Sequence, residues 1–560
     1  MRKRATSGGV TVQAIAGTHS IFFGLDLAAD VRPTCLGFAI HREDHTEKQQ
    51  YWLSGFKTFE SVVPVPNPKA FYSTRDHPVQ SFYWGDYTVK PGHRYTYRIV
   101  PRYRAPKNLV DSPGVEATID ITTGDPDTGP HGVYFNRGVA ASQAYENKFG
   151  DPPDKLKPPE KRAAAMTWLS RGLAEAIAAF IGQAKSQKFA LRAAVYEFTQ
   201  PDVLAAFHQA KDAGADVEIV YAANADPTGD ANRTAIAAAG LDPAMLHPRT
   251  RAKIAHNKFI VLCRKSAAGA LTPVSVWTGS TNFTEGGIFG HSNVGHAVRD
   301  AAVAQRYLEF WGQLLGDPDT DPQRDWVDAN SPFDPASMGP AGIHTLFSPR
   351  HGLAVLNWYA QRFGAATDGG YITGAFGLNA TFENVLVGYS GKALHYVMLD
   401  RADNNQDTWS ADHKVIVAVG SSGGPASLTR WAKEGLTGFN NFVPYLHTKI
   451  ALIDPLGDDP TVISGSANFS PDSTTNNDEN MLIIRGDTEI ADVYFTEFTR
   501  IFNHFYARYW AARLSKGGTD AQEHSFLAET DAWQKPYFAA GNPKRLQRQL
   551  FSSAVQGNIG

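Results

Sequence analysis

The sequence between residues 195 and 470 repeats itself in order, and this repeat constrains the fold more than any other feature of the chain. Four short segments of the first copy, 195–198, 217–221, 254–262 and 277–284, match 374–377, 395–399, 445–453 and 463–470 in the second. In both copies, short β-branched runs alternate with Ala-rich helical stretches, which is typical of an α/β fold. We therefore predict two similar α/β lobes that meet face to face, with the repeated motifs at their interface.

The remaining sequence predicts a separate domain before the repeat, since 560 residues exceed what one hydrophobic core supports. Residues 1–125 form short alternating runs between turns and predict a β-sandwich. The turn 90–92 and the Tyr-x-Tyr-x-Ile run after it resemble a fibronectin type III or immunoglobulin-like module, which implies a fold but no chemistry. Residues 126–160 are rich in Gly, Pro, Asp and Lys and predict a linker. The lobes are then expected at 161–335 and 336–560.

Each copy of the repeat carries a His-x-Lys pair, His256 with Lys258 and His447 with Lys449. Side chains two residues apart on a strand point to the same face. The apolar residues that follow each pair predict a buried strand that fixes the direction of both side chains. We therefore expect four catalytic groups in one site between the lobes.

A Gly-Ser-x-Asn segment follows in each copy and contributes Ser280 and Asn282 from the first, and Ser466 and Asn468 from the second. The glycine permits a close backbone approach, and the hydroxyl and amide are neutral hydrogen-bond donors. Beside a lysine, such donors suit a phosphate group. We predict that these four residues bind phosphate.

Two imidazoles and two ammonium groups can cleave a phosphodiester without a metal or another cofactor. One imidazole can attack phosphorus while the other protonates the leaving oxygen, and the second then activates water or another alcohol against the phosphohistidine intermediate. The lysines would stabilise charge on the phosphoryl oxygens. Zinc ligation by His256 and His447 is the competing interpretation, but the neighbouring lysines would repel a dication and the spacing implies no third ligand.

These motifs resemble those of the phospholipase D superfamily, whose signature is His-x-Lys-x4-Asp followed by Gly-Ser-x-Asn, present twice. The second copy matches fully and includes Asp454, whereas Cys263 replaces this aspartate in the first. Superfamily members that lack the aspartate, including tyrosyl-DNA phosphodiesterases, imply that activity survives the change. The resemblance covers about 165 to 540, including the tail 533–538, and implies mixed sheets flanked by helices.

The superfamily often places a residue that orients the catalytic imidazole eleven positions after the motif Asn. Those positions hold Asn293 and Glu479. We expect Glu479 beside His447, where a carboxylate would favour the imidazolium, and Asn293 beside His256. This predicts His256 as the nucleophile and His447 as the general acid, the order that the resemblance also implies. Asp454 is expected among the orienting residues.

The substrate stays open among three classes. The net charge of −3 and the pI of about 6.7 favour a phospholipid over nucleic acid, with hydrolysis or transfer of a phosphatidyl group as the reaction. A nuclease with a local basic groove and an inactive scaffold or binding protein are the alternatives. No signal peptide or membrane-spanning segment is apparent, so we expect a soluble protein, cytoplasmic or exported without a cleaved signal. Both motifs lie in one chain, so a monomer would suffice, and no partner of the β-domain is implied.

Overall fold

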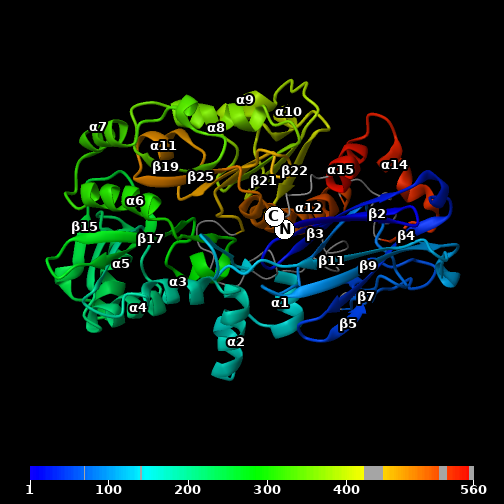
Figure 1. Cartoon of the computed structure of the whole chain (residues 1–560), viewed down its shortest axis with the longest axis horizontal. Helices are drawn as coiled ribbons and strands as arrows, with labels where there is room; N and C mark the ends of the chain where they lie inside the picture. Colours follow the sequence, from blue (N-terminus) through cyan, green and yellow to red (C-terminus); the bar gives the residue numbers. More distant parts are fainter. Residues whose placement is uncertain (68–69, 139–141, 422–444, 516–525, 554–560) are drawn as a thin grey trace.

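The N-terminal region is a β-sandwich in the computed structural model, which describes residues 1–67, 70–138, 142–421, 445–515 and 526–553 (Figure 1). Its first sheet has the order β1-β2-β3-β8 and its second the order β10-β9-β4-β5, with β11 also paired to β9. The strands are β1 (Arg2–Ser7), β2 (Val10–Ala16), β3 (Ile21–Leu27), β4 (Cys35–Asp44), β5 (Gln49–Trp52), β8 (Tyr83–Asp86), β9 (Arg94–Tyr103), β10 (Val110–Asp111) and β11 (Ala117–Thr122). A small pair, β6 (Ser54–Gly55) and β7 (Tyr72–Ser73), lies apart from them. The predicted β-sandwich is confirmed.

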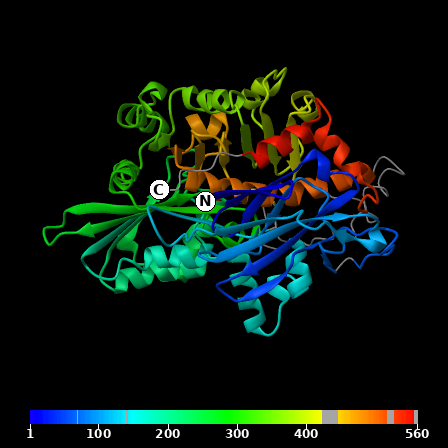
Figure 2. The same ribbon diagram turned by 45° about the vertical axis from the view of Figure 1, so that its right-hand side comes forward.

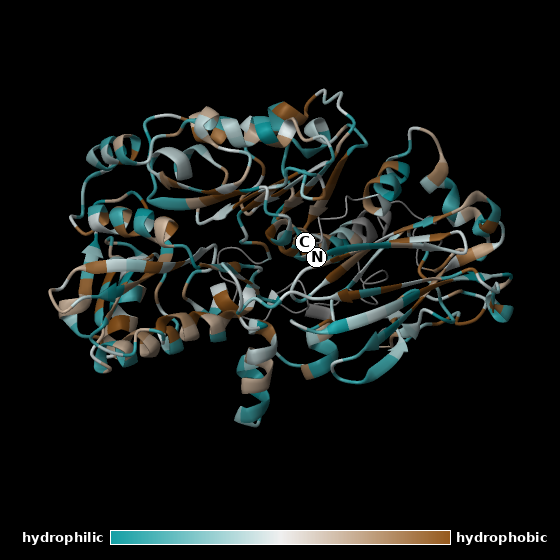
Figure 3. Ribbon diagram, in the orientation of Figure 1, coloured by the Kyte–Doolittle hydropathy of each residue, from teal (hydrophilic) through white to brown (hydrophobic). Residues whose placement is uncertain are grey.

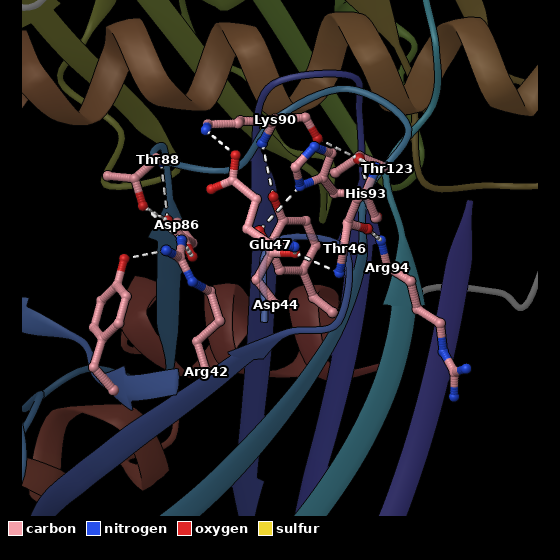
Figure 4. A network of polar contacts seen from close by, with 12 residues as sticks. Arg42, Asp44, Thr46, Glu47, Asp86, Thr88, Lys90, His93, Arg94 and Thr123 are labelled. Carbon is pink, nitrogen blue, oxygen red and sulfur yellow. Dashed lines mark hydrogen bonds and ion pairs between the residues drawn. The ribbon is translucent and has the colours of Figure 1, made fainter. Parts of the chain in front are cut away.

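Buried ionic contacts join the strands of the sandwich (Figure 4). Arg42 donates from Nη1 to Asp86 Oδ2 at 2.8 Å, and the Tyr97 hydroxyl donates to the same oxygen at 2.8 Å. The side chains of Arg42 and Asp86 are only 6% and 2% exposed, so each ion depends on the other for compensation. Nearby, Asp44 lies 3.0 Å from His93 Nδ1.

The two lobes that follow have the same sheet topology. The first sheet has the order β12-β18-β17-β16-β13-β14-β15, and the second β19-β25-β24-β23-β20-β21-β22. In both, the last three strands in this order are parallel to one another and the remaining neighbours are antiparallel. The two predicted α/β lobes with mixed sheets are confirmed.

The first lobe contains the strands β12 (His131–Phe135), β13 (Phe189–Val195), β14 (Asp216–Ala222), β15 (Leu246–Arg249), β16 (Lys258–Lys265), β17 (Leu271–Gly279) and β18 (Val294–Val298). Its helices are α1 (Ser142–Phe149), α2 (Pro159–Ser170), α3 (Leu173–Ile181), α4 (Pro201–Asp212), α5 (Pro227–Ala238), α6 (Ala301–Leu314) and α7 (Thr320–Asn330). The segment 126–160, expected as a linker, thus contains β12, which pairs with β18 at the edge of the sheet.

The second lobe contains β19 (Gly342–Ser348), β20 (Gly369–Gly374), β21 (Leu394–Leu399), β22 (Val415–Val419), β23 (Ile450–Ile453), β24 (Thr461–Gly465) and β25 (Glu479–Arg485). Its helices are α8 (Ala354–Gly364), α9 (Ala380–Leu386), α10 (Gln406–Trp409), α11 (Pro471–Thr475) and α12 (Thr488–Ser515). Within the described part of the chain, no helix is both long and apolar enough to cross a bilayer.

One hydrophobic core joins the two lobes. It contains Phe259 of β16 and Leu452 of β23, together with Phe310 of α6 and Phe498 of α12. Colouring by hydropathy places apolar residues along the strands of both lobes (Figure 3). Because side chains from both sheets are excluded from water in the same core, apolar burial fixes how the lobes face each other.

The segment 526–553 lies against the β-sandwich (Figure 2). It contains a short turn, Asp531–Gln534, and the helices α14 (Lys535–Phe538) and α15 (Pro543–Ser552). The Trp533 ring stacks on Phe82 with centroids 5.3 Å apart, and Phe551 contacts Phe22 of β3 edge to face at 4.9 Å. The end of the expected second lobe therefore completes the core of the N-terminal domain.

We expect Asp86→Ala to destabilise the β-sandwich by about 3–5 kcal/mol, because it leaves the buried Arg42 guanidinium without its anion. The measurement is the thermal midpoint of unfolding. The matched control is Asp120→Ala, which breaks a pair whose side chains are 48% and 63% exposed and should cost about 1 kcal/mol or less. Equal effects of the two changes would contradict the prediction.

Candidate active site

The two His-x-Lys pairs meet where the lobes face each other. His256 precedes β16, whose first residue is Lys258, and His447 and Lys449 directly precede β23. Backbone hydrogen bonds cross between the lobes here. The His447 N–H donates to Ser292 O at 3.0 Å, and the Asp478 N–H donates to Ile254 O at 3.0 Å. The loops that precede β18 and β25 are thereby fixed against the His-x-Lys motif of the other lobe.

The orienting residues are exchanged between the lobes. Glu479 lies 2.8 and 2.9 Å from Nδ1 of His256, and Asn293 Oδ1 lies 3.1 Å from Nδ1 of His447. We call these two contacts the crossed pairs. The expectation that Glu479 lies beside His447 and Asn293 beside His256 was wrong, because each of these residues projects from its own sheet across the interface.

The motif serines support the crossed pairs. Ser466 Oγ donates to Glu479 at 2.7 Å and accepts from the Asn480 N–H, while Ser280 Oγ donates to Asn293 Oδ1 at 2.8 Å and accepts from the Val294 N–H. Both hydroxyls were predicted to bind phosphate. In the structure each one donates its proton to an orienting residue.

Burial controls the protonation of the site. It lowers the pKa of His256 to about 4, against the opposing effect of the Glu479 carboxylate. It also lowers the pKa of His447 well below the usual value, and Lys449 acts in the same direction. Both rings are therefore neutral near pH 7. Each directs its Nδ1–H to its crossed partner, which leaves the lone pair on Nε2.

The lysines are equally buried, each with 1% of its surface exposed. Burial lowers the pKa of Lys258 to about 8, opposed by Glu479 and Glu197, and lowers that of Lys449 well below its usual value. Each ammonium donates to the carbonyl of the motif histidine two residues before it, at 2.7 Å for Lys258 and 2.6 Å for Lys449. An anion entering the site would restore the favourable surroundings that these cations lose on burial.

Asp454 lies at the far end of β23, seven residues and about 20 Å of extended chain from His447. Its carboxylate accepts hydrogen bonds from the N–H groups of 367–369, at the start of β20. Asp454 thus anchors a loop and makes no contact with an imidazole. In the first lobe, Cys263 is a buried strand residue, and burial raises the pKa of its thiol to about 11.

The two motif asparagines differ in their surroundings. Asn282 is buried and donates from Nδ2 to the carboxylate of Glu197. Asn468 is partly exposed and lines a small pocket that Ser348, Arg350 and Tyr359 of the second lobe also line.

Three further residues at the site were not predicted from the sequence. Tyr196 and Glu197 follow β13, and the Tyr196 ring lies 4.9 Å from the His256 ring. The His291 ring lies 4.7 Å from that of His447. Tyr196 and Glu197 could have been suspected from the sequence, because the segment 195–198 is one of the repeated segments. Among the described residues, no group of three His, Cys, Asp or Glu side chains is arranged to hold a metal ion.

Comparison with known proteins identifies the fold of the lobes. The family model described as the cardiolipin synthase, PLD-like domain matches residues 177–314 and 399–502, which contain both His-x-Lys pairs. Each of the two matched segments is similar to a phospholipase D-like domain. The match does not include the tail 533–538, which packs on the β-sandwich although we expected it to belong to the resemblance. No curated protein matches the chain.

Several solved structures are similar to parts of the chain. Phosphatidylserine synthase of Haemophilus influenzae is 12% identical, with a TM-score of 0.43 over 64% of this chain and 94% of that one. The phospholipase D family member Nuc of Salmonella typhimurium is 27% identical, with a TM-score of 0.21 over 26% and 86%. Polyphosphate kinase of Porphyromonas gingivalis is 11% identical, with a TM-score of 0.38 over 56% of this chain, and the match spans less than half of that protein, 43%. These low TM-scores assign no substrate to the chain.

The crossed pairs predict which histidine responds to each substitution. Glu479→Gln should shift the 15N resonances of His256 and lower its pKa further, because the carboxylate raises that pKa. Asn293→Ala should shift those of His447 instead. The measurement is NMR of histidine-labelled protein, with assignments from His256→Gln and His447→Gln. A response of His447 to Glu479→Gln, with His256 unchanged, would contradict the crossed arrangement.

Proposed function

We propose that the chain is a metal-independent phosphodiesterase of the phospholipase D type that hydrolyses or transfers a phosphatidyl group. The crossed pairs are the observation that carries this proposal. Each imidazole belongs to one lobe and is oriented by the other, so the two motifs form one site with two distinguishable histidines. Since one chain supplies both motifs, a monomer is the proposed active unit.

His256 is the proposed nucleophile. Its neutral ring holds the proton on Nδ1, directed to Glu479 at 2.8 Å, and can attack phosphorus through Nε2. As the Nε2–P bond forms, the ring becomes positive, and the adjacent carboxylate stabilises that charge. The sequence also predicted His256 as the nucleophile, but on the expectation that a neutral amide lies beside it. The physical reason proposed here is the opposite one, a carboxylate beside the His256 ring.

His447 is the proposed general acid. Its crossed partner is the neutral amide of Asn293, so no fixed carboxylate holds a proton on this ring. A phosphodiester anion that enters between the lysines raises the pKa of His447, and the ring takes up a proton on Nε2. That proton passes to the leaving oxygen as the P–O bond breaks. His447 then accepts a proton from water or an alcohol, which attacks phosphorus and breaks the bond to His256.

Lys258, Lys449, Asn282 and Asn468 are the proposed ligands of the phosphoryl oxygens. Ser280 and Ser466 are proposed to support the crossed pairs rather than to touch phosphate, because their hydroxyl protons are already donated to Asn293 and Glu479. Asp454 is proposed to anchor the start of β20 in place of orienting an imidazole.

A phospholipid is the proposed substrate class, on the basis of charge near the first motif. The segment that leads to His256 contains three cations, and each faces a carboxylate: Arg249 with Asp478 at 2.8 Å, Arg251 with Asp319 at 2.9 Å and Lys253 with Asp472 at 2.9 Å. Binding of nucleic acid depends on cations that neutralise several successive phosphates. The local neutrality of this segment favours a substrate with a single phosphate.

The substrate proposal is tested by assaying the purified chain, with EDTA present, against phosphatidylcholine or phosphatidylethanolamine vesicles and, in parallel, plasmid and single-stranded DNA. We expect release of the head group without DNA cleavage, because no step requires a metal and only one phosphate is bound. DNA cleavage without lipid hydrolysis would assign the nuclease activity instead. Loss of all activity on addition of EDTA would contradict the metal-free mechanism.

The histidine roles are tested with bis(p-nitrophenyl) phosphate, a diester whose leaving group needs little protonation. His447→Asn should release one equivalent of p-nitrophenol and then stop, because the covalent intermediate forms but lacks its base. His256→Asn should release none. Mass spectrometry should detect the phosphoryl adduct on His256 in the first variant. A burst from His256→Asn would reverse the two roles.

A further inference from the structure

Glu197 places a carboxylate in the site that belongs to neither His-x-Lys pair. It lies two residues after the end of β13, and its carbonyl accepts the Phe283 N–H at 3.0 Å, which fixes the loop beside Asn282. Its carboxylate accepts a hydrogen bond from Nδ2 of Asn282. Because an amide nitrogen has two N–H groups, Asn282 retains a second donor for a ligand.

The second lobe has no carboxylate at the corresponding position. Strand β20 corresponds to β13 and ends at Gly374, so Ala375 and Phe376 occupy the positions of Tyr196 and Glu197. Phe376 is 70% exposed. An acid at this position therefore breaks the symmetry of the paired motifs.

Glu197 acts on the charge of both lysines. Burial raises the pKa of the Glu197 carboxyl, and Lys258 and Lys449 oppose this rise. In turn, Glu197 opposes the lowering of the pKa of both lysines. Glu479, the other carboxylate, is held by His256 and Ser466. Counting only the described residues, the two lysines and two carboxylates leave the site close to neutral before any ligand binds.

We propose that Glu197 makes the site select singly charged phosphodiesters over doubly charged phosphates, an inference that rests on the proposed function of the same site. Two lysines without Glu197 would suit a dianion, such as a phosphate monoester or inorganic phosphate. With Glu197, a second negative charge on the ligand lies near a carboxylate in a poorly solvated site, where repulsion is strong. The same repulsion would favour departure of a monoester product.

The test measures anion binding by calorimetry at pH 7, below the pKa of Lys258, where a large share of inorganic phosphate is the dianion and dimethyl phosphate is the singly charged diester. Glu197→Gln keeps an oxygen that can accept from Asn282 but removes the charge. We expect the ratio of the phosphate to the dimethyl phosphate dissociation constant to fall by about tenfold or more. Glu116→Gln, which removes an exposed carboxylate of the β-sandwich, should leave the ratio unchanged.

A positioning role alone gives a different result. In that case Glu197→Ala would weaken both anions equally and Glu197→Gln would change neither, which would overturn the proposal. Thermal unfolding of each variant checks that the fold is kept. A shifted ratio in a chain that hydrolyses no phospholipid would support the role of Glu197 and refute the proposed function. An unchanged ratio in a chain that hydrolyses phospholipid would support the proposed function and refute the role of Glu197. If neither anion bound, both proposals would be refuted.

Discussion

The hydrogen bond between Glu479 and His256 is the contact on which the arrangement of the lobes depends. It joins the first residue of β25 to the motif of the other lobe, and the contact of Asn293, just before β18, with His447 joins the lobes in the opposite direction. Neither lobe can present an oriented imidazole alone. The relative position of two seven-stranded sheets must therefore be held to within hydrogen-bonding tolerance.

The surroundings of the crossed pairs meet this demand. Arg249 is fully buried and donates to Asp478 of the other lobe, the residue before Glu479. Asn480, the residue after it, donates to Asn257 and accepts from Thr278. Polar contacts of the residues before and after Glu479 thus hold it in place. The hydrophobic core that contains residues of α6 and α12 buries apolar surface and so resists separation of the lobes. The polar contacts therefore align the two lobes, whereas the apolar core stabilises their association.

The sequence was sufficient for the parts of the structure that repeat. The order of matched segments predicted two similar lobes, and the two-residue spacing of His256 and Lys258 predicted a shared direction. The hydrogen-bond partners of the two imidazoles could not be predicted from the sequence, because a spacing within one lobe does not reveal contacts with the other lobe. Strand β12 was hidden in a turn-rich segment for the same reason, since its pairing with β18 is distant in sequence. The repeat placed Glu197 opposite Phe376, but the contact of Glu197 with Asn282 is visible only in the structure.

The packing of 526–553 on the β-sandwich constrains how the domains of such a protein can evolve. Trp533, Tyr537 and Phe538 complete a core whose other members come from the first 121 residues, while Phe551 joins β3 to the core between the lobes. A β-domain of this kind is usually regarded as a portable module that recombination can attach or remove. Here its loss would leave those aromatic rings in water, and its transfer to another protein would leave its own core incomplete. The sandwich and the two lobes are therefore expected to share one evolutionary history and to diverge together.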